Sequence, residues 1–535
     1  MEIPYDYIVV GAGSSGSVLA ERLSSDGLSR VLLVEEGGPA NWLSRMPKGY
    51  GKLLSDPLFA HFYPTSRPLE ARGPSETWVR GRMAGGSSAI NGMVWIRGAQ
   101  EDYDSLAAAG NAGWDWNVMR RCLKALENHH LGASEDRGAD GPLPIHTNPD
   151  RTRLADAFIA AGSEAGLAIK DDQNGPVQEG IGYAQWNIDL HGRRVSAARA
   201  FLEPARGRAN LSLRHGIQVR RVLFEERRAV GIAATQNGQP VEFRANRAVI
   251  LCTGAIITPK LLQLSGIGDS ALLARHGLQV VQHSPLVGKR MHEHLGLPLS
   301  FRLRHWQDSD NRQYSRTRLL RNVLHYALRG RGPMARGAAE AIAFVRALPG
   351  SNRPDTQLMF NPFSLGEAKD GISFEDEPGM QCYSYILRPE SQGYVEIVSA
   401  DPSAKPRVDP NYLATERDRT TSVAATRFIR RILEQPQLAG LVVGETARTA
   451  WAQSDDEILQ LYDRYGHSGY HAVGTAAMGP SEQDVVDDRL RVRGIEGLRI
   501  ADCSVFPQIP SGNTNAPAMA LGWRAAEILR EDAVV

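Results

Sequence analysis

Residues 7–36 read YIVVGAGSSGSVLAERLSSDGLSRVLLVEE, and this stretch decides the fold of the chain. A short apolar run is followed by a glycine-rich turn, a helical pattern and a second apolar run that ends at Glu35. Short apolar runs bounded by turn residues are typical of buried strands, and a helix commonly connects two parallel ones. The stretch therefore predicts one βαβ unit.

Gly11, Gly13 and Gly16 give the turn the pattern Gly-x-Gly-x-x-Gly. In such a turn the first glycine allows the tight bend, the second lets the backbone approach a pyrophosphate, and the third lets the helix pack closely on the sheet. The positive end of the helix then faces the phosphates. Glu35 is placed to accept hydrogen bonds from the ribose of an adenosine. The unit predicts dinucleotide binding, leaves FAD and NAD both open, and has a plain glycine-rich turn as its alternative.

The length and charge of the chain limit its class. A chain of 535 residues is too long for one simple core, which favours two domains that share a cleft. Its 61 basic and 60 acidic side chains leave a net charge of +1, which argues against nucleic acid as a partner. No apolar stretch is long enough to span a bilayer, and the first residues enter a strand at once, so neither an integral membrane segment nor an export signal is expected. Peripheral membrane contact stays open.

The four cysteines argue against a zinc site or a disulfide framework, because they lie far apart and lack a C-x-x-C spacing. They are Cys122, Cys252, Cys382 and Cys503. A reducing compartment fits such free thiols best, so we expect a cytoplasmic protein.

A second glycine-rich stretch, RGRMAGGSSAINGMVWIRG, covers residues 80–98. It places Gly-Gly-Ser-Ser at 85–88 ahead of the apolar run 93–96. Backbone amides and small hydroxyl groups in this order suit a flat polar ligand, whereas a flexible linker would not continue into an apolar run. We therefore expect this stretch to contact a ligand.

Two later strands end in the same way as the first. Residues 244–252 form an apolar run that leads into Gly254 and a helical pattern from Pro259. Residues 497–501 form a short strand that ends in Asp502, and a helical pattern follows over 516–529. A strand that runs into such a turn and then a helix is the geometry of a sheet edge that faces a nucleotide.

The middle of the chain has longer loops, helical stretches and alternating strand patterns, unlike the two ends, so we expect it to form a second domain. Periodicity predicts amphipathic helices over 114–130, 154–166 and 316–329, and alternation predicts strands over 381–387 and 394–399. The arginines along 316–336 could form a docking surface, although a solvated helix face is the simpler explanation. The expected division is a dinucleotide domain from 1–155, 196–300 and 464–535, and a substrate domain from 156–195 and 301–463.

Two polar residues near the C-terminus are candidates for chemistry. His471 lies in SGYHAVGTAAMG, and Asn515 lies in PSGNTNAPAMA just ahead of the last helical pattern. A histidine that titrates near neutral pH can take a proton from an alcohol as hydride leaves its carbon. Asn515 could hold the same oxygen by a hydrogen bond. The alternatives are a structural histidine and an ordinary helix N-cap.

Together these motifs resemble the glucose-methanol-choline (GMC) family of FAD-dependent alcohol oxidoreductases. The family's first signature resembles RGRMAGGSSAINGMVWIRG, and its second matches GAIITPKLLQLSGIG at 254–268. Further matches are VGKRMHEHL at 287–295, RPESQGYVEIVSADP from Arg388, YHAVGTAAMG from Tyr470 and RIADCSVFPQIPSGNTNAP from Arg499. The resemblance covers nearly the whole chain and is strongest to the bacterial choline-dehydrogenase-like branch.

This resemblance implies FAD as the cofactor and an α/β fold, α+β overall. It implies a Rossmann-like FAD-binding domain of the glutathione-reductase type and a substrate domain built on an antiparallel sheet flanked by helices. The implied contacts are Gly11, Gly13, Gly16 and Glu35 for the ADP half; Gly85, Gly86, Ser87 and Asn91 for the pyrophosphate and flavin; Val219 for the adenine; and Asp502, Asn513, Thr514 and Pro517 for the ribityl chain and ring.

The resemblance also implies a mechanism. His471 would be the base that accepts the hydroxyl proton, Asn515 would orient the oxygen as the second active-site residue, and the hydride would pass to flavin N5. The final helix would point its positive end at the flavin ring. Relatives that attach FAD covalently carry a histidine where Ile90 stands here, so we expect non-covalent FAD.

The leading hypothesis is an FAD-dependent alcohol dehydrogenase that oxidises a primary or secondary alcohol. Its electron acceptor would be a quinone, an artificial dye or O2. An alcohol oxidase, a hydroxynitrile-lyase-like enzyme and a non-catalytic flavin-binding protein are the alternatives. Nothing in the sequence identifies the alcohol.

Overall fold

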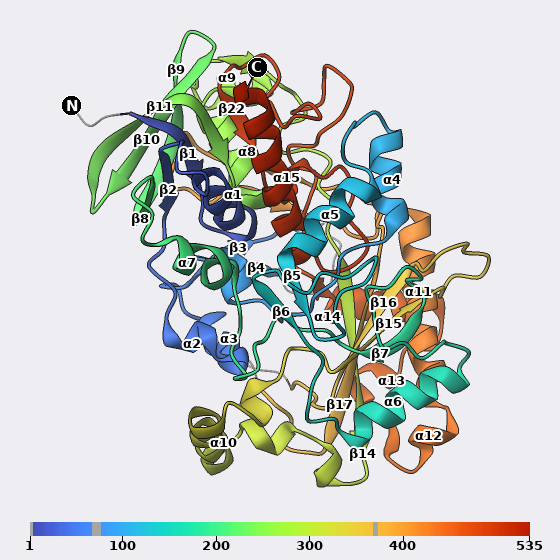
Figure 1. The fold of residues 1–535 in the computed structure, drawn as a ribbon. Helices are drawn as coiled ribbons and strands as arrows, with labels where there is room; N and C mark the ends of the chain where they lie inside the picture. The colour runs from blue at the N-terminus through green and yellow to red at the C-terminus, as the bar shows by residue number, and fades with distance from the viewer. Residues whose placement is uncertain (1–3, 67–75, 367–372, 535) are drawn as a thin grey trace.

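Two sheets organise the chain, of which the computed structural model describes residues 4–66, 76–366 and 373–534. The strands of the first sheet are β1 (Tyr5–Val10), β2 (Val31–Glu35), β8 (Leu211–His215), β9 (Ile217–Glu225), β10 (Arg228–Gln236), β11 (Gln239–Leu251) and β22 (Leu498–Ile500). They follow the order β8-β2-β1-β11-β10-β9, with β22 beside β11, and lie at the upper left of Figure 1.

The first sheet is parallel around β1 and antiparallel at its far side. β1 pairs in parallel with β2 and with the second half of β11, so that Val9 lies opposite Leu33 and Ile250. The first half of β11 pairs antiparallel with β10, which pairs antiparallel with β9. Helix α1 (Ser14–Ser24) connects β1 to β2. The predicted βαβ unit is therefore confirmed.

The carboxyl ends of four strands meet at one edge of this sheet. β1 leads into Gly11, β2 ends at Glu35, β11 leads to Gly254 and β22 leads to Asp502. Doubly wound sheets bind their ligands in the crevice beyond these ends.

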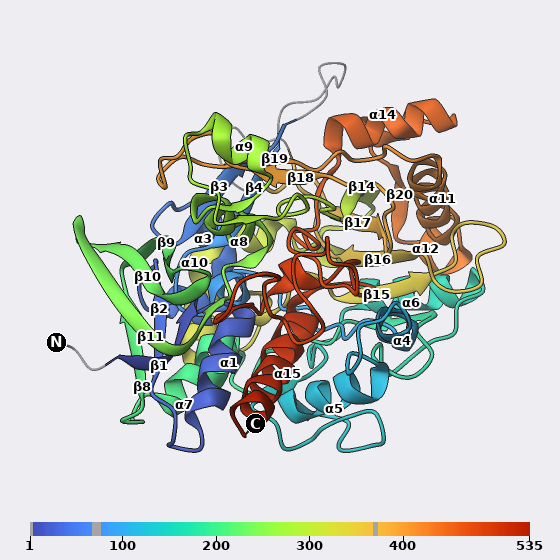
Figure 2. The ribbon, with the colours of Figure 1, turned by 90° about the horizontal axis from the view of Figure 1, so that it is seen from above.

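Helices α1 and α15 (Asn515–Val534) lie side by side beside this sheet, as Figures 1 and 2 show. α1 begins directly after Gly13, and α15 begins at Asn515. Residues at both starts line one cavity, so two helix N-termini face the same space.

The second sheet is antiparallel throughout and lies at the lower right of Figure 1. Its strands are β7 (Gly180–Tyr183), β14 (Leu295–Leu303), β15 (Ala341–Val345), β16 (Thr356–Asn361), β17 (Gly379–Ile386), β20 (Val442–Glu445) and β21 (His467–Ser468). They follow the order β20-β14-β17-β16-β15-β7, with β21 beside β14. The mixed α/β fold with a second, antiparallel sheet is thus as predicted.

Side chains of β16 and β17 alternate between a helix-covered face and an open one. Phe360 and Cys382 pack in a core with the covering helices, whereas Met359 and Tyr383 line the cavity. This is the period-two alternation of a strand. The covering helices are α6 (Arg153–Glu164), α11 (Glu416–Leu433), α12 (Pro436–Ala439) and α14 (Asp455–Tyr465). The other face of the sheet therefore forms part of the cavity wall, through Met359 and Tyr383.

The remaining helices and strand pairs lie around these two sheets. The helices are α2 (Trp42–Arg45), α3 (Tyr50–Leu53), α4 (Gln100–Ala108), α5 (Trp116–Leu126), α7 (Glu203–Ala205), α8 (Gly254–Leu264), α9 (Ser270–Arg275), α10 (Arg316–Arg329) and α13 (Ala447–Ala450). The strand pairs are β3 (Ala60–Pro64) with β4 (Thr77–Gly81), β5 (Glu127–His129) with β6 (Leu143–Ile145), β12 (Ile267–Gly268) with β13 (Gln282–His283), and β18 (Tyr394–Glu396) with β19 (Arg407–Asp409). No helix in the described part of the chain is long and apolar enough to cross a bilayer.

Helix α8 begins earlier than its sequence predicts. The helical pattern was expected from Pro259, but α8 starts at Gly254 and includes the proline. Pro259 has no N–H to donate to the carbonyl of Ala255 four residues earlier. The hydroxyl of Thr475 donates to this carbonyl instead, at 2.7 Å, so a contact from the distant C-terminal segment makes the proline tolerable.

Most strands of the second sheet come from the segments expected to form the substrate domain, 156–195 and 301–463. β14 begins before the second of these segments, at Leu295, and β21 follows it at His467. The exact domain boundaries stay a prediction.

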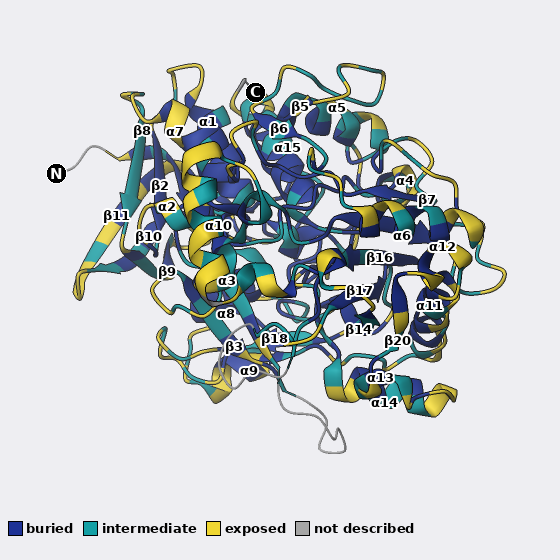
Figure 3. Cartoon of the chain, turned by 90° about the horizontal axis from the view of Figure 1, so that it is seen from below, coloured by how far each residue is buried: buried dark blue, intermediate teal, exposed yellow. Residues whose placement is uncertain are grey.

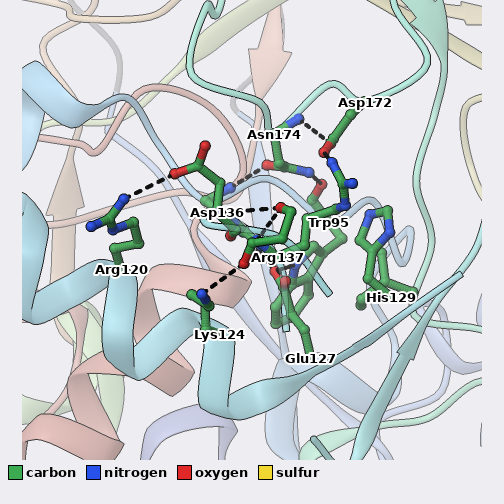
Figure 4. A network of polar contacts seen from close by, with 12 residues as sticks. Trp95, Arg120, Lys124, Glu127, His129, Asp136, Arg137, Asp172 and Asn174 are labelled. Carbon is green, nitrogen blue, oxygen red and sulfur yellow. Dashed lines mark hydrogen bonds and ion pairs between the residues drawn. The ribbon is translucent and has the colours of Figure 1, made fainter. Parts of the chain in front are cut away.

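Residues 94–97 join the cores of the two sheets, and a buried polar network holds them in place (Figure 4). Trp95 packs in the core of the first sheet, whereas Val94 and Ile96 pack in a cluster with strands of the second. The Trp95 indole N–H donates to Glu127 at 2.7 Å, and Arg97 Nε donates to the same carboxylate oxygen at 2.6 Å. Arg97 and Glu127 are fully buried. The ion pair therefore holds this segment in register between the sheets.

Candidate active site

A cavity of about 1020 Å³ extends from the carboxyl edge of the first sheet to the open face of the second. Gly11, Gly13 and Glu35 line it at the first sheet, and Met359 and Tyr383 line it at the second. Pockets that bind drug-sized ligands reach about this volume. The cavity is therefore large enough to hold a cofactor and a small substrate.

The second glycine-rich stretch packs directly on the first turn. A Cβ added at Gly86, where φ is +51°, would come 2.8 Å from the Cα of Gly13. The amide of Gly85 donates to the carbonyl of Ala12 at 2.7 Å, which fixes this approach. Around Gly13 itself, the nearest described atom to an added Cβ is the Cys252 carbonyl oxygen at 4.0 Å. The turn thus offers open backbone to the cavity, as a pyrophosphate requires.

Glu35 fastens the turns that leave β1 and β2. The Ala12 amide donates to its Oε2 at 3.0 Å, and the Gly37 amide donates to its Oε1 at 2.9 Å. Burial raises the pKa of the Glu35 carboxyl, while these amides oppose the shift. Since a carboxylate has about four acceptor positions, Glu35 keeps capacity for ribose hydroxyl groups.

Asp502 joins the ends of β22 and β11. Its Oδ2 accepts from the Gly254 amide at 2.9 Å and from the Thr258 hydroxyl at 2.6 Å. Its Oδ1 accepts from the Ser504 amide at 2.9 Å. Burial raises the pKa of Asp502. These bonds hold the start of α8 at the cavity wall.

Most residues expected to contact the cofactor line this cavity. They are Gly11, Gly13, Glu35, Gly86, Ser87, Asn91, Val219, Asp502, Asn513 and Thr514. Three others, Gly16, Gly85 and Pro517, do not line the cavity but support its wall. Gly16 packs α1 against the turn, because a Cβ there would come 2.0 Å from the Gly11 carbonyl oxygen, and Gly85 bonds to Ala12. Pro517 is buried in the first turn of α15.

His471 lies in the cavity wall shortly after β21 and is only 8% exposed. Its amide donates to Oε1 of Glu293 at 2.7 Å. Its Nδ1 lies 2.9 Å from Nδ1 of His294, and its Nε2 lies 3.1 Å from Nδ2 of Asn513. Both ring nitrogens therefore have defined partners.

A chain of hydrogen bonds assigns the proton on His471. Nε2 of His294 lies 3.0 Å from the carbonyl oxygen of Leu387, and a carbonyl can only accept, so this nitrogen donates. Nδ1 of neutral His294 is then an acceptor, and Nδ1 of His471 must donate to it. Nε2 of His471 keeps its lone pair, to which the Asn513 amide donates. His471 is thus arranged as a proton acceptor.

Burial keeps both imidazoles neutral. It lowers the pKa of His294 to about 3. It also lowers the pKa of His471 well below its ordinary value, and the nearby His294 and Arg80 act in the same direction. Glu293 is also buried, and burial raises its pKa to about 7 against the charge of Arg80, whose Nη2 lies 3.7 Å from Oε2. His471 is therefore neutral near neutral pH, and its Nε2 lone pair is free to act as a base.

The expected pairing of His471 with Asn515 is not formed, and Asn513 takes that place. Oδ1 of Asn515 accepts from the Ser14 hydroxyl at 2.8 Å. Asn515 is the first residue of α15, which packs on α1, so its side chain meets α1. Asn513 still belongs to the loop before the helix and reaches His471.

Sequence patterns did not single out Glu293 and His294, which hold the backbone and the ring of His471. The available signal was the His-Glu-His run at 292–294, directly ahead of β14. Its meaning depends on a contact with a residue far along the chain, which local patterns do not reveal.

The residues of this cavity fit FAD. A dinucleotide needs amides for its pyrophosphate and a carboxylate for its ribose. The open backbone at Gly13 and the N-terminus of α1 supply the first, and Glu35 supplies the second. Nδ2 of Asn515, at the start of α15, is buried with no hydrogen-bond partner among the described residues, so a bound group would satisfy it.

The two sheets and the site between them are those of a flavin-dependent oxidoreductase. The family model for GMC oxidoreductase matches residues 5–296 and 389–522. The chain is 37% identical to "Alcohol dehydrogenase [acceptor]" of Pseudomonas putida, over 98% of this chain and 95% of that protein. It is 37% identical to "Choline dehydrogenase, mitochondrial" of Homo sapiens, over 98% of this chain and 90% of that protein.

Among solved structures, pyridoxine 4-oxidase from Mesorbium loti superposes with a TM-score of 0.89 at 29% identity. The match covers 98% of this chain and 99% of that one. The chain belongs to the GMC oxidoreductase family, and the residues of its cavity fit FAD.

Proposed function

We propose that this protein oxidises a primary or secondary alcohol to the carbonyl compound, with His471 as the base and Asn513 as the residue that holds the oxygen. The observation that carries the proposal is the chain from Leu387 through His294 to His471, which leaves the His471 Nε2 lone pair beside Asn513. Bound FAD supplies the acceptor for the hydride that leaves the alcohol carbon.

His471 and Asn513 have complementary tasks toward a hydroxyl group. Nε2 of His471 can accept the hydroxyl proton, while the Asn513 amide, which now donates to that nitrogen, can donate to the alcohol oxygen. His294 keeps the His471 Nδ1 proton in place as the other nitrogen becomes protonated. His471 and His294 are both buried, which shields the hydrogen bond between their rings from water.

An anaerobic titration tests this function. Purified protein is mixed with a panel of alcohols, and the visible absorption of oxidised flavin is followed. Bleaching is the expected result, and a flavin that no alcohol bleaches would leave only a lyase or a flavin-binding function. Asn513→Ala should slow bleaching at least about tenfold. Asn515→Ala should weaken FAD binding more than it slows bleaching, and the reverse order would contradict the assignment.

A dehydrogenase is the preferred form of the enzyme, with a quinone or an artificial dye as acceptor. The similarity to two dehydrogenases supports this choice. Admitting air to the bleached protein tests it. Slow return of colour in air, with fast return on adding a quinone, is expected; fast return in air would indicate an oxidase.

Non-covalent FAD is supported by Ile90, which lines the cavity and has an aliphatic side chain with no atom able to attach the flavin. Acid precipitation should therefore leave a yellow supernatant. A yellow pellet under a colourless supernatant would disprove this point.

A cytoplasmic location is supported by the cysteines, which are all free thiols.

Helix α10 in addition supplies a surface for peripheral contact with an anionic bilayer. Its Leu320, Leu324 and Leu328 are 72%, 62% and 76% exposed and, four residues apart, share one side of the helix. Figure 3 shows exposed residues of α10 in yellow. The helix carries four arginines and no acidic residue. An exposed apolar stripe with basic flanks suits an anionic lipid surface.

Co-sedimentation with vesicles of anionic phospholipid tests this surface. The double variant Leu320→Ser and Leu324→Ser should lose binding that the wild-type protein has. Leu28→Ser, at a residue 84% exposed in the turn before β2, is the matched control and should still bind. Equal sedimentation of both variants would argue against α10 as the surface that binds the bilayer.

A further inference from the structure

Lys48 occupies an aromatic cage in the wall of the cavity. Its Nζ lies 6.0 Å from the ring centre of Tyr50, 5.7 Å from that of Tyr314 and 5.1 Å from that of Phe363. All four residues line the cavity that His471 also lines. Aromatic faces attract cations at these distances. We call these four residues the Lys48 cage.

The Lys48 cage adjoins the part of the cavity where the flavin is expected. Nζ of Lys48 donates to the carbonyl of Gly337 at 2.7 Å. The next residue, Ala338, donates its amide to the carbonyl of Gly92 at 3.0 Å. Gly92 follows Asn91, and both line the cavity. A substrate that reaches His471 therefore shares its cavity with the ammonium group of Lys48.

Lys48 belongs to a group of two cations and two carboxylates, with Arg336, Asp310 and Glu340. Burial lowers its pKa to about 8, while Asp310 and Glu340 act to raise it, so the side chain is mostly charged at neutral pH. Both carboxylates already pair with Arg336, whose Nη1 lies 2.7 Å from Asp310 and 3.0 Å from Glu340. The four groups together come close to neutrality, which leaves no negative charge for a further cation.

The walls near the Lys48 cage offer a cation no carboxylate. Among the described residues, the carboxylates that line the cavity are Glu35, Glu36 and Asp502. Glu35 and Asp502 bond to backbone amides at the dinucleotide edge, and Glu36 pairs with Arg82 at 3.2 Å. The remaining wall around the cage is apolar, from Leu319, Val323, Met334, Leu365 and Phe374.

We propose that the substrate is a neutral alcohol with an apolar body, and that Lys48 excludes alcohols that carry a quaternary ammonium group. Recognition of such a group uses the faces of aromatic rings, and here Lys48 already fills those faces with its own ammonium. A second cation would meet the like charge of Lys48, and the two nearby carboxylates already balance Lys48 and Arg336. This specificity rests on the proposed alcohol oxidation, and it separates the chain from the choline dehydrogenase to which it is similar.

A matched pair of alcohols tests the specificity. Choline and its carbon isostere, 3,3-dimethylbutan-1-ol, have the same shape and differ in charge. The wild-type protein should show a kcat/KM for the neutral alcohol at least about tenfold higher than for choline. Lys48→Met should lower this preference at least about tenfold, because it removes the charge and frees the rings. Lys48→Arg keeps the charge and should keep the preference.

Binding of tetramethylammonium gives a second readout that needs no turnover. Calorimetry on the oxidised holoenzyme should show no binding to the wild-type protein or to Lys48→Arg, and binding to Lys48→Met. Lys48→Gln, which can still donate to the Gly337 carbonyl, replaces Lys48→Met if that variant does not fold.

The outcomes separate this inference from the proposed function. A wild-type preference for choline, or a preference that Lys48→Met leaves unchanged, overturns the role of Lys48 while alcohol oxidation stands. If no alcohol reduces the flavin in any variant, the proposed function fails. Tetramethylammonium binding then decides alone whether Lys48 blocks the cage.

Discussion

His294 determines which nitrogen of His471 carries the proton. The Leu387 carbonyl forces His294 to donate from Nε2, and His294 then forces His471 to donate from Nδ1. His294→Phe removes the acceptor and frees His471 to adopt the other tautomer, so flavin reduction by an alcohol should slow at least about tenfold. His294→Asn, whose Oδ1 can still accept from His471, should retain more of the rate.

Rapid-mixing measurements of flavin reduction on the two FAD-loaded variants check this role. A faster rate of flavin reduction in His294→Asn than in His294→Phe would show that the hydrogen bond from residue 294 positions His471. Equal losses in both variants would indicate that His294 acts only through packing.

The depressed pKa of His471 predicts the pH dependence of the reaction. An exposed histidine loses its basic form below about pH 6.5. Because burial lowers the pKa of His471 well below that value, the basic form persists, and the reduction rate should fall only at more acid pH. An inflection near pH 7 that disappears in Glu293→Gln would belong to Glu293. An inflection near pH 6.5 that persists in Glu293→Gln would contradict the depressed pKa.

Single residues differ in how far the sequence predicts them. His471 could be proposed from its motif, and it lies in the cavity wall. The choice between Asn513 and Asn515 could not be made, because it depends on where α15 begins and on its packing against α1. The Lys48 cage was not predictable, since residues at 48, 314 and 363 meet only after the chain has folded.

At the scale of elements, the contact between two glycine-rich stretches forms the floor of the cofactor site. Gly86→Ala should strain a backbone with φ of +51° and push against the Cα of Gly13 at 2.8 Å. We expect FAD to bind at least about tenfold more weakly, measured by titrating the apoprotein with FAD. Gly132→Ala is the control, because φ there is +76° and no described atom lies within 4 Å of an added Cβ. Equal FAD affinity in the two variants would contradict this role for Gly86.

Local patterns predicted the elements that depend on local physics. The first βαβ unit and the helices α5, α6 and α10 follow from apolar periodicity. The segment 37–79 is rich in glycine, proline and aromatic residues and shows little periodicity, yet it contains α2, α3, β3 and β4. Residues 67–75 lie outside the described part of the chain. The early start of α8 depends on Thr475, far away in the sequence, and so no local pattern could predict it.

At the scale of the whole molecule, the Arg97–Glu127 pair fastens the segment between the two cores. Glu127→Gln leaves the Arg97 charge buried and uncompensated, which typically costs about 3–5 kcal/mol. We expect a clear drop in the thermal midpoint of the holoenzyme. Glu416→Gln, which breaks the exposed pair with Arg419, should change stability by at most about 1 kcal/mol. Similar shifts in both variants would show that the buried pair does not hold the sheets together.

The arrangement of the two sheets explains why distant segments form one site. Both glycine-rich stretches, the ends of β11 and β22 and the start of α15 reach one cavity, and the second sheet closes it. The motifs indicated these pieces one by one, and the family resemblance implied that they meet at one FAD. The fold adds the physical reason, because long-range strand pairing such as β11 with β22 brings the pieces to one edge of the sheet.

The most direct measurement is the rate of flavin reduction under anaerobic conditions, for the wild-type protein and for His471→Ala with FAD bound. We expect a neutral alcohol to reduce the wild-type flavin and the variant to react at least about 100-fold more slowly, because a general base contributes that much. A flavin that no alcohol reduces, or a variant within a few-fold of the wild-type rate, would contradict His471 as the base of an alcohol oxidoreductase.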